Sequence, residues 1–318
     1  MKLLNCVFSY NRPIYLRNTV ESLLEYFKFG DTTVIDDGSE DPKTLEYLNE
    51  LKRRGVQVVN QNRFADQAMY QYLHGGLYEN MDLAVELAER GGYQYVHFVQ
   101  DDVQFMWHDP DLPAKVERIF QIPKASMVEN VFFWGIVRDR IGKRLELIPE
   151  ANCYHRIPHG LLDMGIMPVA LLREHRFRFG NGIESTNSAW WRRRGYKAYR
   201  LHAPSMMYVP WPVTFRPGKG QLGHAVTPIH KYLLKPLDKA QIDQLTSRPL
   251  TDIPFAEDYC FPWGWKCKTP YWGKSAGDSE YDSSRFHPWR TRLAPIRPIA
   301  RFLVPRPVRA FLRTLLGD

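Results

Sequence analysis

The sequence is poor in cysteine and has no paired cysteine motif. Its four cysteines are Cys6, Cys153, Cys260 and Cys267. They lack the Cys-x-x-Cys spacing of a zinc site and the density of a secreted disulfide scaffold. We therefore expect a reducing compartment, although Cys260 and Cys267 are close enough in sequence to form a disulfide.

Long apolar runs are also missing. No run approaches the roughly 20 residues that span a bilayer, and the run from Leu3 to Phe8 is shorter than a signal-peptide core. We expect a protein that is neither exported nor membrane-spanning, with a cytoplasmic location.

Acidic residues are absent from most of the C-terminal segment. Seven arginines lie between residues 290 and 313, and no acid follows them before Asp318. Residues 295–318 combine five of these arginines with bulky apolar residues, which is typical of an element on an anionic membrane surface. A helix docked on the rest of the protein, with its arginines in solvent, explains the same pattern.

The composition is that of a globular protein. Of 318 residues, 44% are hydrophobic and 25% are charged, and the formal net charge is +8. This charge favours anionic partners but does not distinguish phosphorylated small molecules from nucleic acid or membrane.

Strand-like and helix-like patterns alternate through the first 105 residues. Apolar runs predict strands at 3–8, 32–35, 56–59 and 93–99, and helical periodicity predicts helices at 16–27, 42–54 and 76–89. This alternation predicts a mostly parallel sheet flanked by helices, whose ligands bind at the carboxyl ends of the strands.

The pattern is weaker after residue 110. We expect a strand at Val131–Ile136, a strand or helix at Gly165–Leu172, and a helix that ends at Gly195 before another strand. Residues 203–220, rich in Pro, Met and aromatic residues, are interpreted as a loop.

Two pairs of adjacent aspartates follow predicted strands. They lie in Asp-Asp-Gly-Ser at residues 36–39 and in Gln-Asp-Asp at residues 100–102. Like charges this close raise each other's pKa unless a cation lies between them. Mg²⁺ or Mn²⁺ takes one or two carboxylates and completes its shell with phosphate oxygens and water, so the pairs favour a metal and a diphosphate. Two solvated turns are the simpler alternative.

The sequence resembles the family-2 glycosyltransferases, which have the GT-A fold. The resemblance lies in Ser-Tyr-Asn-Arg-Pro at 9–13, Val-Glu-Ser-Leu at 20–23, Val-Ile-Asp-Asp-Gly-Ser at 34–39 and Gln-Asp-Asp at 100–102. It implies an α/β, GT-A-like fold with a mostly parallel central sheet flanked by helices, an acceptor-side extension and a basic tail. Residues 1–110 would form the nucleotide-sugar half, 111–240 the acceptor half and 241–318 a C-terminal extension.

The resemblance also implies roles for donor-site residues. Tyr10 would lie against the nucleotide base, and Asp37 would accept hydrogen bonds from base or ribose. Asp101 and Asp102 would meet the ribose and a Mn²⁺ or Mg²⁺ ion, with Asp102 as the metal ligand. The same segment would supply Asn11 and Arg12 to the donor. The sequence departs from the family at Gln100, where an acid often stands, and in having adjacent aspartates instead of a spaced pair.

The second half offers a candidate base and an aromatic pair. Glu184 resembles the family's acidic motif at the start of a helix and could accept the acceptor's proton in an inverting reaction. Asp163 is the competing acid, and a helix-dipole role for Glu184 is the alternative. Trp190 and Trp191 could stack on a sugar face or pack in the core.

A later loop carries basic residues and a histidine. Arg216 and Lys219 could clamp the diphosphate, or they could form a solvated basic loop. His224 could be a third metal ligand, although a lone histidine is more often structural.

Together these features predict an inverting glycosyltransferase that moves a hexose-type sugar from a UDP or GDP donor to a glycan or lipid-linked acceptor. Synthesis of a surface polysaccharide at the inner face of the cell membrane would suit the tail. A nucleotidyltransferase is one alternative, although its Gly-rich phosphate loop is missing. A non-catalytic protein that binds nucleic acid or a membrane surface is the other. Because the basic residues gather in the tail, we expect no nucleic-acid partner.

Overall fold

The computed structural model describes residues 1–61, 76–133, 145–156, 164–181, 184–208 and 235–259. Strands and helices alternate in its first part: β1 (Leu3–Ser9), α1 (Pro13–Tyr26), β2 (Asp31–Asp36), α2 (Pro42–Arg53), β3 (Gln57–Asn60), α3 (Leu77–Arg90), β4 (Tyr95–Gln100) and β5 (Val103–Phe105). These elements confirm the β-α-β alternation predicted for the first 105 residues.

The second part continues the same architecture with shorter elements. They are α4 (Leu112–Phe120), β6 (Ala125–Glu129), β7 (Leu145–Ile148), the 3-10 helix η3 (Pro149–Ala151), β8 (Cys153–Arg156), β9 (Gly165–Pro168), α6 (Val169–Glu174), the 3-10 helix η4 (Phe179–Asn181), α7 (Glu184–Arg193), β10 (Lys197–Leu201), β11 (Met206–Tyr208), α8 (Lys239–Ser247) and α9 (Ala256–Tyr259).

One large sheet contains most of the described strands, in the order β3-β2-β1-β4-β9-β6-β10-β8-β7. β3, β2, β1 and β4 are parallel neighbours, and β10 is parallel to β6. β9 runs antiparallel to both β4 and β6, and β8 runs antiparallel to β10 and β7. All the other strands therefore point the same way, which confirms the mostly parallel α/β sheet.

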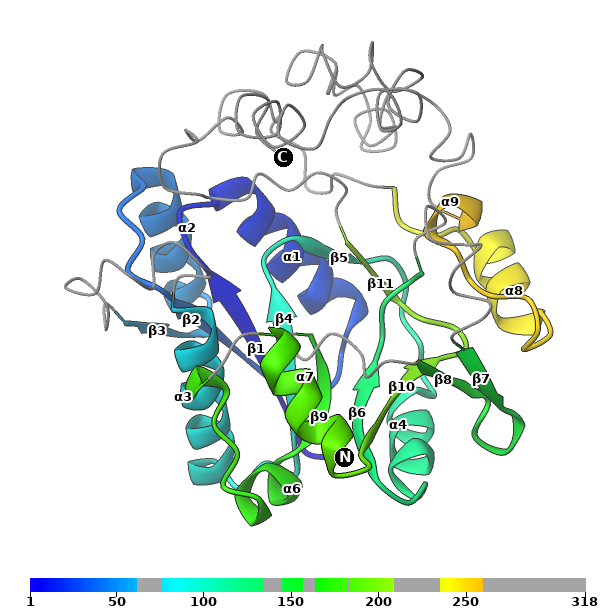
Figure 1. The fold of residues 1–318 in the computed structure, drawn as a ribbon. Helices are drawn as coiled ribbons and strands as arrows, with labels where there is room; N and C mark the ends of the chain where they lie inside the picture. The colour runs from blue at the N-terminus through cyan, green and yellow to red at the C-terminus, as the bar shows by residue number, and fades with distance from the viewer. Residues whose placement is uncertain (62–75, 134–144, 157–163, 182–183, 209–234, 260–318) are drawn as a thin grey trace, which may run out of the picture.

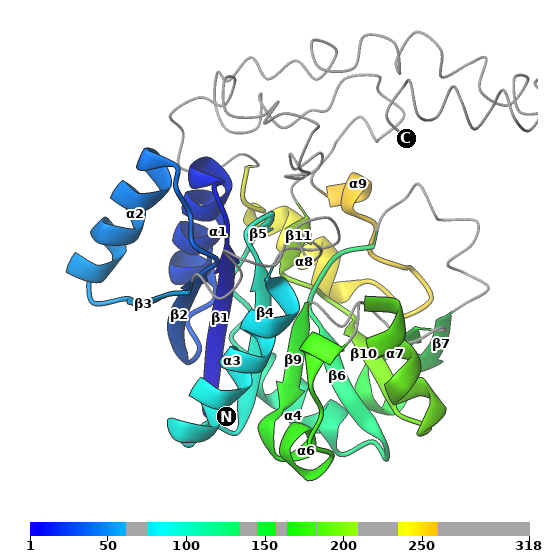
Figure 2. The same ribbon diagram turned by 60° about the vertical axis from the view of Figure 1, so that its left-hand side comes forward.

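Helices cover both faces of this sheet, as the two views show (Figure 1 and Figure 2). The central strand β1 is buried along its whole length. Its Leu3 and Val7 pack with α1 and α2 in one core cluster, whereas Cys6 and Phe8 pack with α3 and α7 in another. Alternate side chains of a strand point to opposite faces, so this continuous apolar run supplies both cores.

Two predictions for the second part were wrong in detail. The strand of the sheet is Ala125–Glu129 and not Val131–Ile136; Val131 and Phe133 form only isolated bridges, and residues 134–136 lie outside the described ranges. Within the predicted loop 203–220, residues 206–208 form β11, which pairs with β5. The physical reason is that both segments pair with partners far along the chain, which a local pattern does not reveal.

Other predictions for this part are confirmed. The segment 165–172 contains both a strand and the start of a helix. Gly195 follows α7 with a φ of 78°, a left-handed conformation that glycine adopts without strain, and the chain then enters β10.

Cys6 and Cys153 are buried thiols, while Cys260 and Cys267 lie outside the described residues. None of the helices in the described ranges has the length and apolarity needed to cross a bilayer.

Candidate functional site

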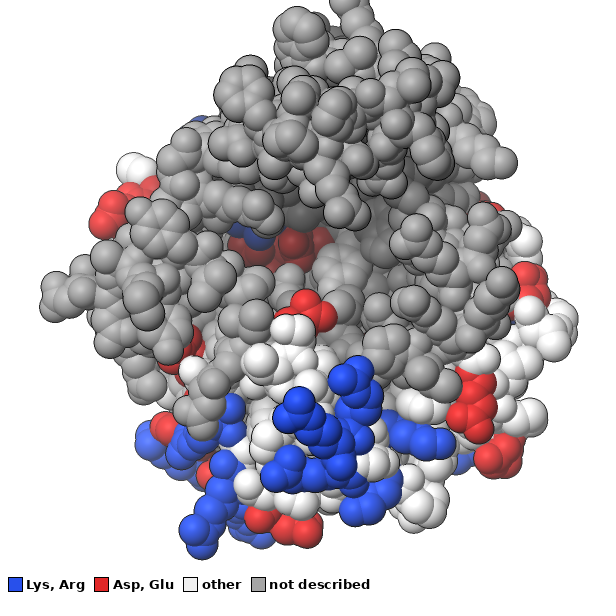
Figure 3. Space-filling model, in the orientation of Figure 1, with Lys and Arg blue, Asp and Glu red and all other residues white. Residues whose placement is uncertain are grey.

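The loops that follow β1, β2 and β4 meet at one edge of the sheet. These three strands are parallel neighbours, so their carboxyl ends lie side by side. The loops carry Tyr10 to Arg12, Asp37, and the Asp101–Asp102 pair. Figure 3 shows acidic side chains beside a basic one at the bottom of a hollow in the molecular surface.

The adjacent aspartates after β2 have different surroundings. Asp36 is fully buried and accepts hydrogen bonds from the backbone N–H and the hydroxyl of Ser39, at 2.8 and 2.6 Å. Asp37 is only partly buried and accepts from the backbone N–H of Gly76, at 2.8 Å, and from the side chain of Asn80, at 3.2 Å. Burial raises the pKa of Asp37, whereas these two hydrogen bonds lower it. Asp37 is therefore the more exposed member of the pair.

Tyr10 and Asn11 occupy the loop after β1. Burial raises the pKa of Tyr10, and the charges of Glu40 and Asp37 raise it further. Asn11 has a φ of 50° and is buried; its side-chain oxygen accepts from the backbone N–H groups of Glu40 and Asp41, at 2.7 and 2.9 Å. The oxygen of Asn11 thus fastens the β1 loop to the β2 loop.

Arg12 bridges the two aspartates after β4. Its Nη1 donates to Asp101 Oδ1 at 2.6 Å, and its Nη2 lies 3.7 Å from Asp102 Oδ2. The hydroxyl of Thr19 in α1 contacts the backbone oxygens of Asp101 and Val103, at 2.8 and 2.6 Å. Helix α1, which begins at Pro13 immediately after Arg12, therefore holds both the cation and the turn that carries its partners.

The two aspartates are poorly solvated. Burial raises the pKa of Asp101 to about 7; the charge of Arg12 opposes this effect, and the charge of Asp102 adds to it. Burial also raises the pKa of Asp102, again against the effect of Arg12. One oxygen of each carboxylate, Asp101 Oδ2 and Asp102 Oδ1, is buried without a hydrogen-bond partner among the described residues.

This donor set fits a hard divalent cation. Carboxylate oxygens are the ligands that Mg²⁺ and Mn²⁺ prefer, and an ion bound with a phosphorylated ligand needs only one or two of them. The two buried oxygens without partners at a strand end meet that requirement. Within the described ranges, no group of three or more His, Cys, Asp or Glu side chains gathers to hold a metal by itself. A metal here would therefore complete its shell with ligand oxygens and water.

Helix α7 places Glu184 at the same end of the sheet. Gly180, in the preceding 3-10 helix, packs against Glu79 and Asp82 of α3, and Asp82 accepts from the backbone N–H groups of Phe179 and Gly180. Since α3 begins beside Asp37, residues 179 and 180 lie against the helix whose first turn contacts Asp37. Glu184 is the first residue of α7 and is half-buried.

The two tryptophans of α7 have different surroundings. Trp191 is fully buried, and its ring packs against His175, Phe177 and Tyr196. Trp190 is half-buried and has the guanidinium of Arg194 3.6 Å from its ring centroid. The prediction of an exposed stacking surface was wrong for Trp191, because α6 and the turn after α7 cover it. Core packing, the alternative, accounts for its position.

Some predicted residues lie outside the described ranges, and other site residues were missed. Asp163, Arg216, Lys219, His224 and the tail 295–318 belong to segments that the structure does not describe. Gly76 and Asn80, which hold Asp37, were not predicted. The helical periodicity around Met81 located α3, but nothing local in the sequence indicated that its first turn meets Asp37.

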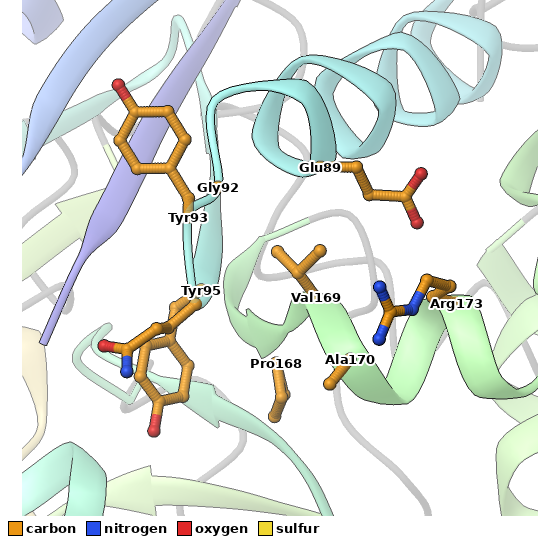
Figure 4. Close-up of a pocket in the computed structure, with 9 residues that line it drawn as sticks. Glu89, Gly92, Tyr93, Tyr95, Pro168, Val169, Ala170 and Arg173 are labelled. Carbon is orange, nitrogen blue, oxygen red and sulfur yellow. The ribbon is translucent and has the colours of Figure 1, made fainter.

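A separate depression lies at the opposite end of β4. It measures about 520 Å³ and is lined by residues from the α3–β4 turn and from β9 and α6, including Tyr95, Val169 and Arg173. Figure 4 shows Glu89 and Arg173 on the same side of this open depression. It contains none of the predicted site residues.

Of the comparisons with known proteins, only the comparison with solved structures found matches. No family model and no curated protein matches the sequence. TarS of S. aureus, residues 1–349, is 19% identical with a TM-score of 0.46; the match covers 65% of this chain and 60% of TarS. A mannosyltransferase, PcManGT from Pyrobaculum calidifontis, solved with GDP-Man and Mn²⁺, is 15% identical with a TM-score of 0.46, covering 68% and 58%.

A cytidylyltransferase from Leptospira borgpetersenii is 13% identical with a TM-score of 0.38, covering 63% of this chain and 76% of that enzyme. The chain thus spans about three-fifths of the length of the TarS fragment, which has also been solved with UDP and with UDP-GlcNAc. The solved structures to which this chain is similar therefore include proteins that bind nucleotide sugars.

Proposed function

We propose that this protein is a metal-dependent glycosyltransferase that uses a nucleoside diphosphate sugar. One observation carries the proposal: Asp37, Tyr10 and the Arg12–Asp101–Asp102 cluster converge at the carboxyl ends of adjacent parallel strands. Ligands of α/β sheets bind at such ends. The nucleoside of such a donor suits Tyr10 and Asp37. Its diphosphate, together with a metal ion, suits the buried charges of the Arg12–Asp101–Asp102 cluster.

The two parts of the site have different tasks. Tyr10 and Asp37 follow the neighbouring parallel strands β1 and β2, and Tyr10 offers a ring for the nucleobase. The carboxylate of Asp37 is held by Gly76 and Asn80, and each of its oxygens can accept one more hydrogen bond, from an N–H of the base or a hydroxyl of the ribose. Asp101 and Asp102 would meet the ribose and the metal, with Asp102 as the metal ligand. Bound there, the metal would neutralise charge that develops on the leaving diphosphate.

The chemical step needs a base on the acceptor side. The acceptor's hydroxyl oxygen forms a bond to the anomeric carbon as the bond from that carbon to the diphosphate oxygen breaks. The bonding electrons leave with the nucleoside diphosphate, and Glu184 takes the hydroxyl proton. Attack opposite to the leaving group inverts the anomeric centre. Asp163 stays the competing candidate for the base, and Arg216, Lys219 and His224 stay candidates for the diphosphate and the metal.

The acceptor and the location are inferred from the sequence. The acceptor would be a glycan or a lipid-linked sugar in surface polysaccharide synthesis, and residues 295–318 would attach the protein to an anionic membrane surface. Each basic residue near such a surface contributes about 1 kcal/mol. Deletion of residues 295–318 should release the protein from vesicles containing anionic lipid while donor hydrolysis persists, and retention of the truncated protein on the vesicles would contradict the attachment.

A panel of nucleotide sugars tests the activity. Hydrolysis of UDP- and GDP-sugars is measured with Mn²⁺, with Mg²⁺ and with EDTA, in the wild type, in Asp102→Ala and in the control Asp243→Asn, whose aspartate is exposed on α8. We expect metal-dependent release of a nucleoside diphosphate that is lost only in Asp102→Ala. Release of pyrophosphate from a nucleoside triphosphate and a sugar phosphate would instead identify a nucleotidyltransferase.

A further inference from the structure

Arg12 occupies the place of a cation between two carboxylates. It lies 2.6 Å from Asp101 and 3.7 Å from Asp102, and the three side chains are only 14%, 7% and 11% exposed. Among the described residues, a single guanidinium is thus the counter-ion of both acids. With both acids ionised, the buried cluster still carries one uncompensated negative charge.

The cluster is incomplete as a set of hydrogen bonds. Among the residues that the structure describes, Nε and Nη2 of Arg12, Oδ2 of Asp101 and Oδ1 of Asp102 are buried without a hydrogen-bond partner. Buried polar atoms are normally paired, because leaving them unpaired is unfavourable. Two nitrogens of the guanidinium thus lack acceptors, and one oxygen of each carboxylate lacks a donor or a metal ion. A divalent cation that arrives with a diphosphate supplies both.

We infer that Arg12 is a resident counter-ion that prevents Asp101 and Asp102 from binding a divalent cation until a diphosphate is present. This inference rests on the proposed function and deepens it. A free divalent cation at the carboxylates would lie next to the guanidinium and be repelled by it. A diphosphate offers Arg12 a bidentate partner of its own, since guanidinium groups match phosphate oxygens. Arg12 would then turn from the carboxylates to the phosphates.

The consequence is coupled binding of metal and nucleotide. Calorimetry is carried out with Mn²⁺ alone, with UDP or GDP alone, and with both, on the wild type. We expect weak binding of Mn²⁺ alone, and a tightening of about tenfold or more when the nucleotide is present, within the usual range of coupling between sites. Mn²⁺ should tighten nucleotide binding by the same factor, because coupling is reciprocal.

Three variants isolate the role of Arg12. Arg12→Gln removes the guanidinium charge, so Mn²⁺ alone should bind about tenfold tighter than in the wild type while the coupling shrinks. Arg12→Lys keeps a positive charge and should bind Mn²⁺ alone as weakly as the wild type. Arg17→Gln is the matched control, because Arg17 lies on the same helix but pairs with Glu50 at an exposed position. A purely structural role for Arg12 would not tighten metal binding.

Each result has a defined meaning. If Arg12→Gln folds and binds Mn²⁺ no tighter than the wild type, the inference fails, while nucleotide and metal binding by the wild type leaves the proposed function standing. If the wild type binds neither Mn²⁺ nor any nucleotide in any combination, the proposed function fails and the inference with it. If circular dichroism shows that Arg12→Gln is unfolded, the wild-type titrations decide, and an absence of coupling between Mn²⁺ and nucleotide overturns the inference.

Discussion

Asp36 and Asp37 are neighbours in the chain, yet the carboxylate of Asp36 closes its own loop through Ser39 while the carboxylate of Asp37 reaches the first turn of a helix some forty residues away. The β-strand explains the difference, since successive side chains leave it in opposite directions. Asp36 therefore stabilises its own loop, whereas Asp37 lies at the carboxyl ends of the strands, where ligands of α/β sheets bind.

The first prediction separates these two roles by substitution. Asp36→Asn should lower the free energy of unfolding by about 1.5–3 kcal/mol, because it weakens hydrogen bonds to a charged acceptor. Asp37→Asn should change stability little and should weaken binding of UDP or GDP by roughly 10- to 100-fold, the equivalent of one charged hydrogen bond. Urea denaturation and calorimetry measure the two effects. Equal loss of stability in both variants would show that Asp37 is also structural.

The second prediction concerns the general base. Glu184→Gln keeps the side-chain shape but cannot accept a proton, so turnover should fall by about 10² to 10⁴ while donor affinity is retained. Transfer rates and donor titrations on the same preparation measure both quantities. Asp163→Asn is the companion variant. Normal turnover in Glu184→Gln, together with a loss in Asp163→Asn, would move the base to the other acid.

The third prediction distinguishes the two tryptophans. Trp191→Ala should destabilise the fold by about 3–5 kcal/mol, as is usual when a large buried aromatic side chain is removed. Trp190→Ala should have a clearly smaller effect, because the ring is half-buried and one face lies against Arg194. Thermal and chemical denaturation measure both. A larger loss in Trp190→Ala would contradict the packing described around α7.

The fourth prediction is a dependence of stability on pH. Burial lowers the pKa of His97 to about 3, and the unfolded chain has an ordinary histidine near 6.5. The folded state therefore binds fewer protons, so the contribution of His97 is fully present above pH 6.5 and is lost as the pH falls below that value. Between pH 6.5 and 5 the loss is about 2 kcal/mol.

His97→Gln isolates this effect, because the acids with raised pKa values, which act in the opposite sense, are the same in both proteins. Urea denaturation at several pH values gives the free energy of unfolding of wild type and variant. As the pH falls from 6.5 to 5, the free energy of unfolding of the wild type should decrease by about 2 kcal/mol more than that of the variant. Parallel curves would mean that the pKa of His97 is the same in the folded and unfolded protein.

Local patterns were sufficient for the first half of the chain and insufficient for the second. The apolar run of β1 and the helical periodicity of α1 and α3 are strong signals, because each pattern is visible within a short window of the sequence. By contrast, β6 has the mixed composition Ala-Ser-Met-Val-Glu, and its strand character depends on β9 and β10. Pairing with partners so far along the chain leaves little trace in a short window.

The candidate site shows the same division. The aspartate pairs could be located from the sequence because they follow recognisable strands. The salt bridge of Arg12 with Asp101 spans 89 positions and brings together two loops that no local pattern connects. The burial of Trp191 likewise depends on α6 and Tyr196, so the choice between platform and core needed the three-dimensional arrangement.

The position of β9 has a consequence for the order of folding. β4 and β6 are not neighbours in the sheet; β9 lies between them and pairs with both. During synthesis, β3, β2, β1 and β4 can assemble first. The other edge of β4 stays unpaired until β9, which ends at residue 168, has left the ribosome. An unpaired strand edge is prone to intermolecular pairing. We therefore expect ribosome-bound chains that end between residues 105 and 160 to be the most aggregation-prone species of this protein, and chains extended past β10 to be soluble.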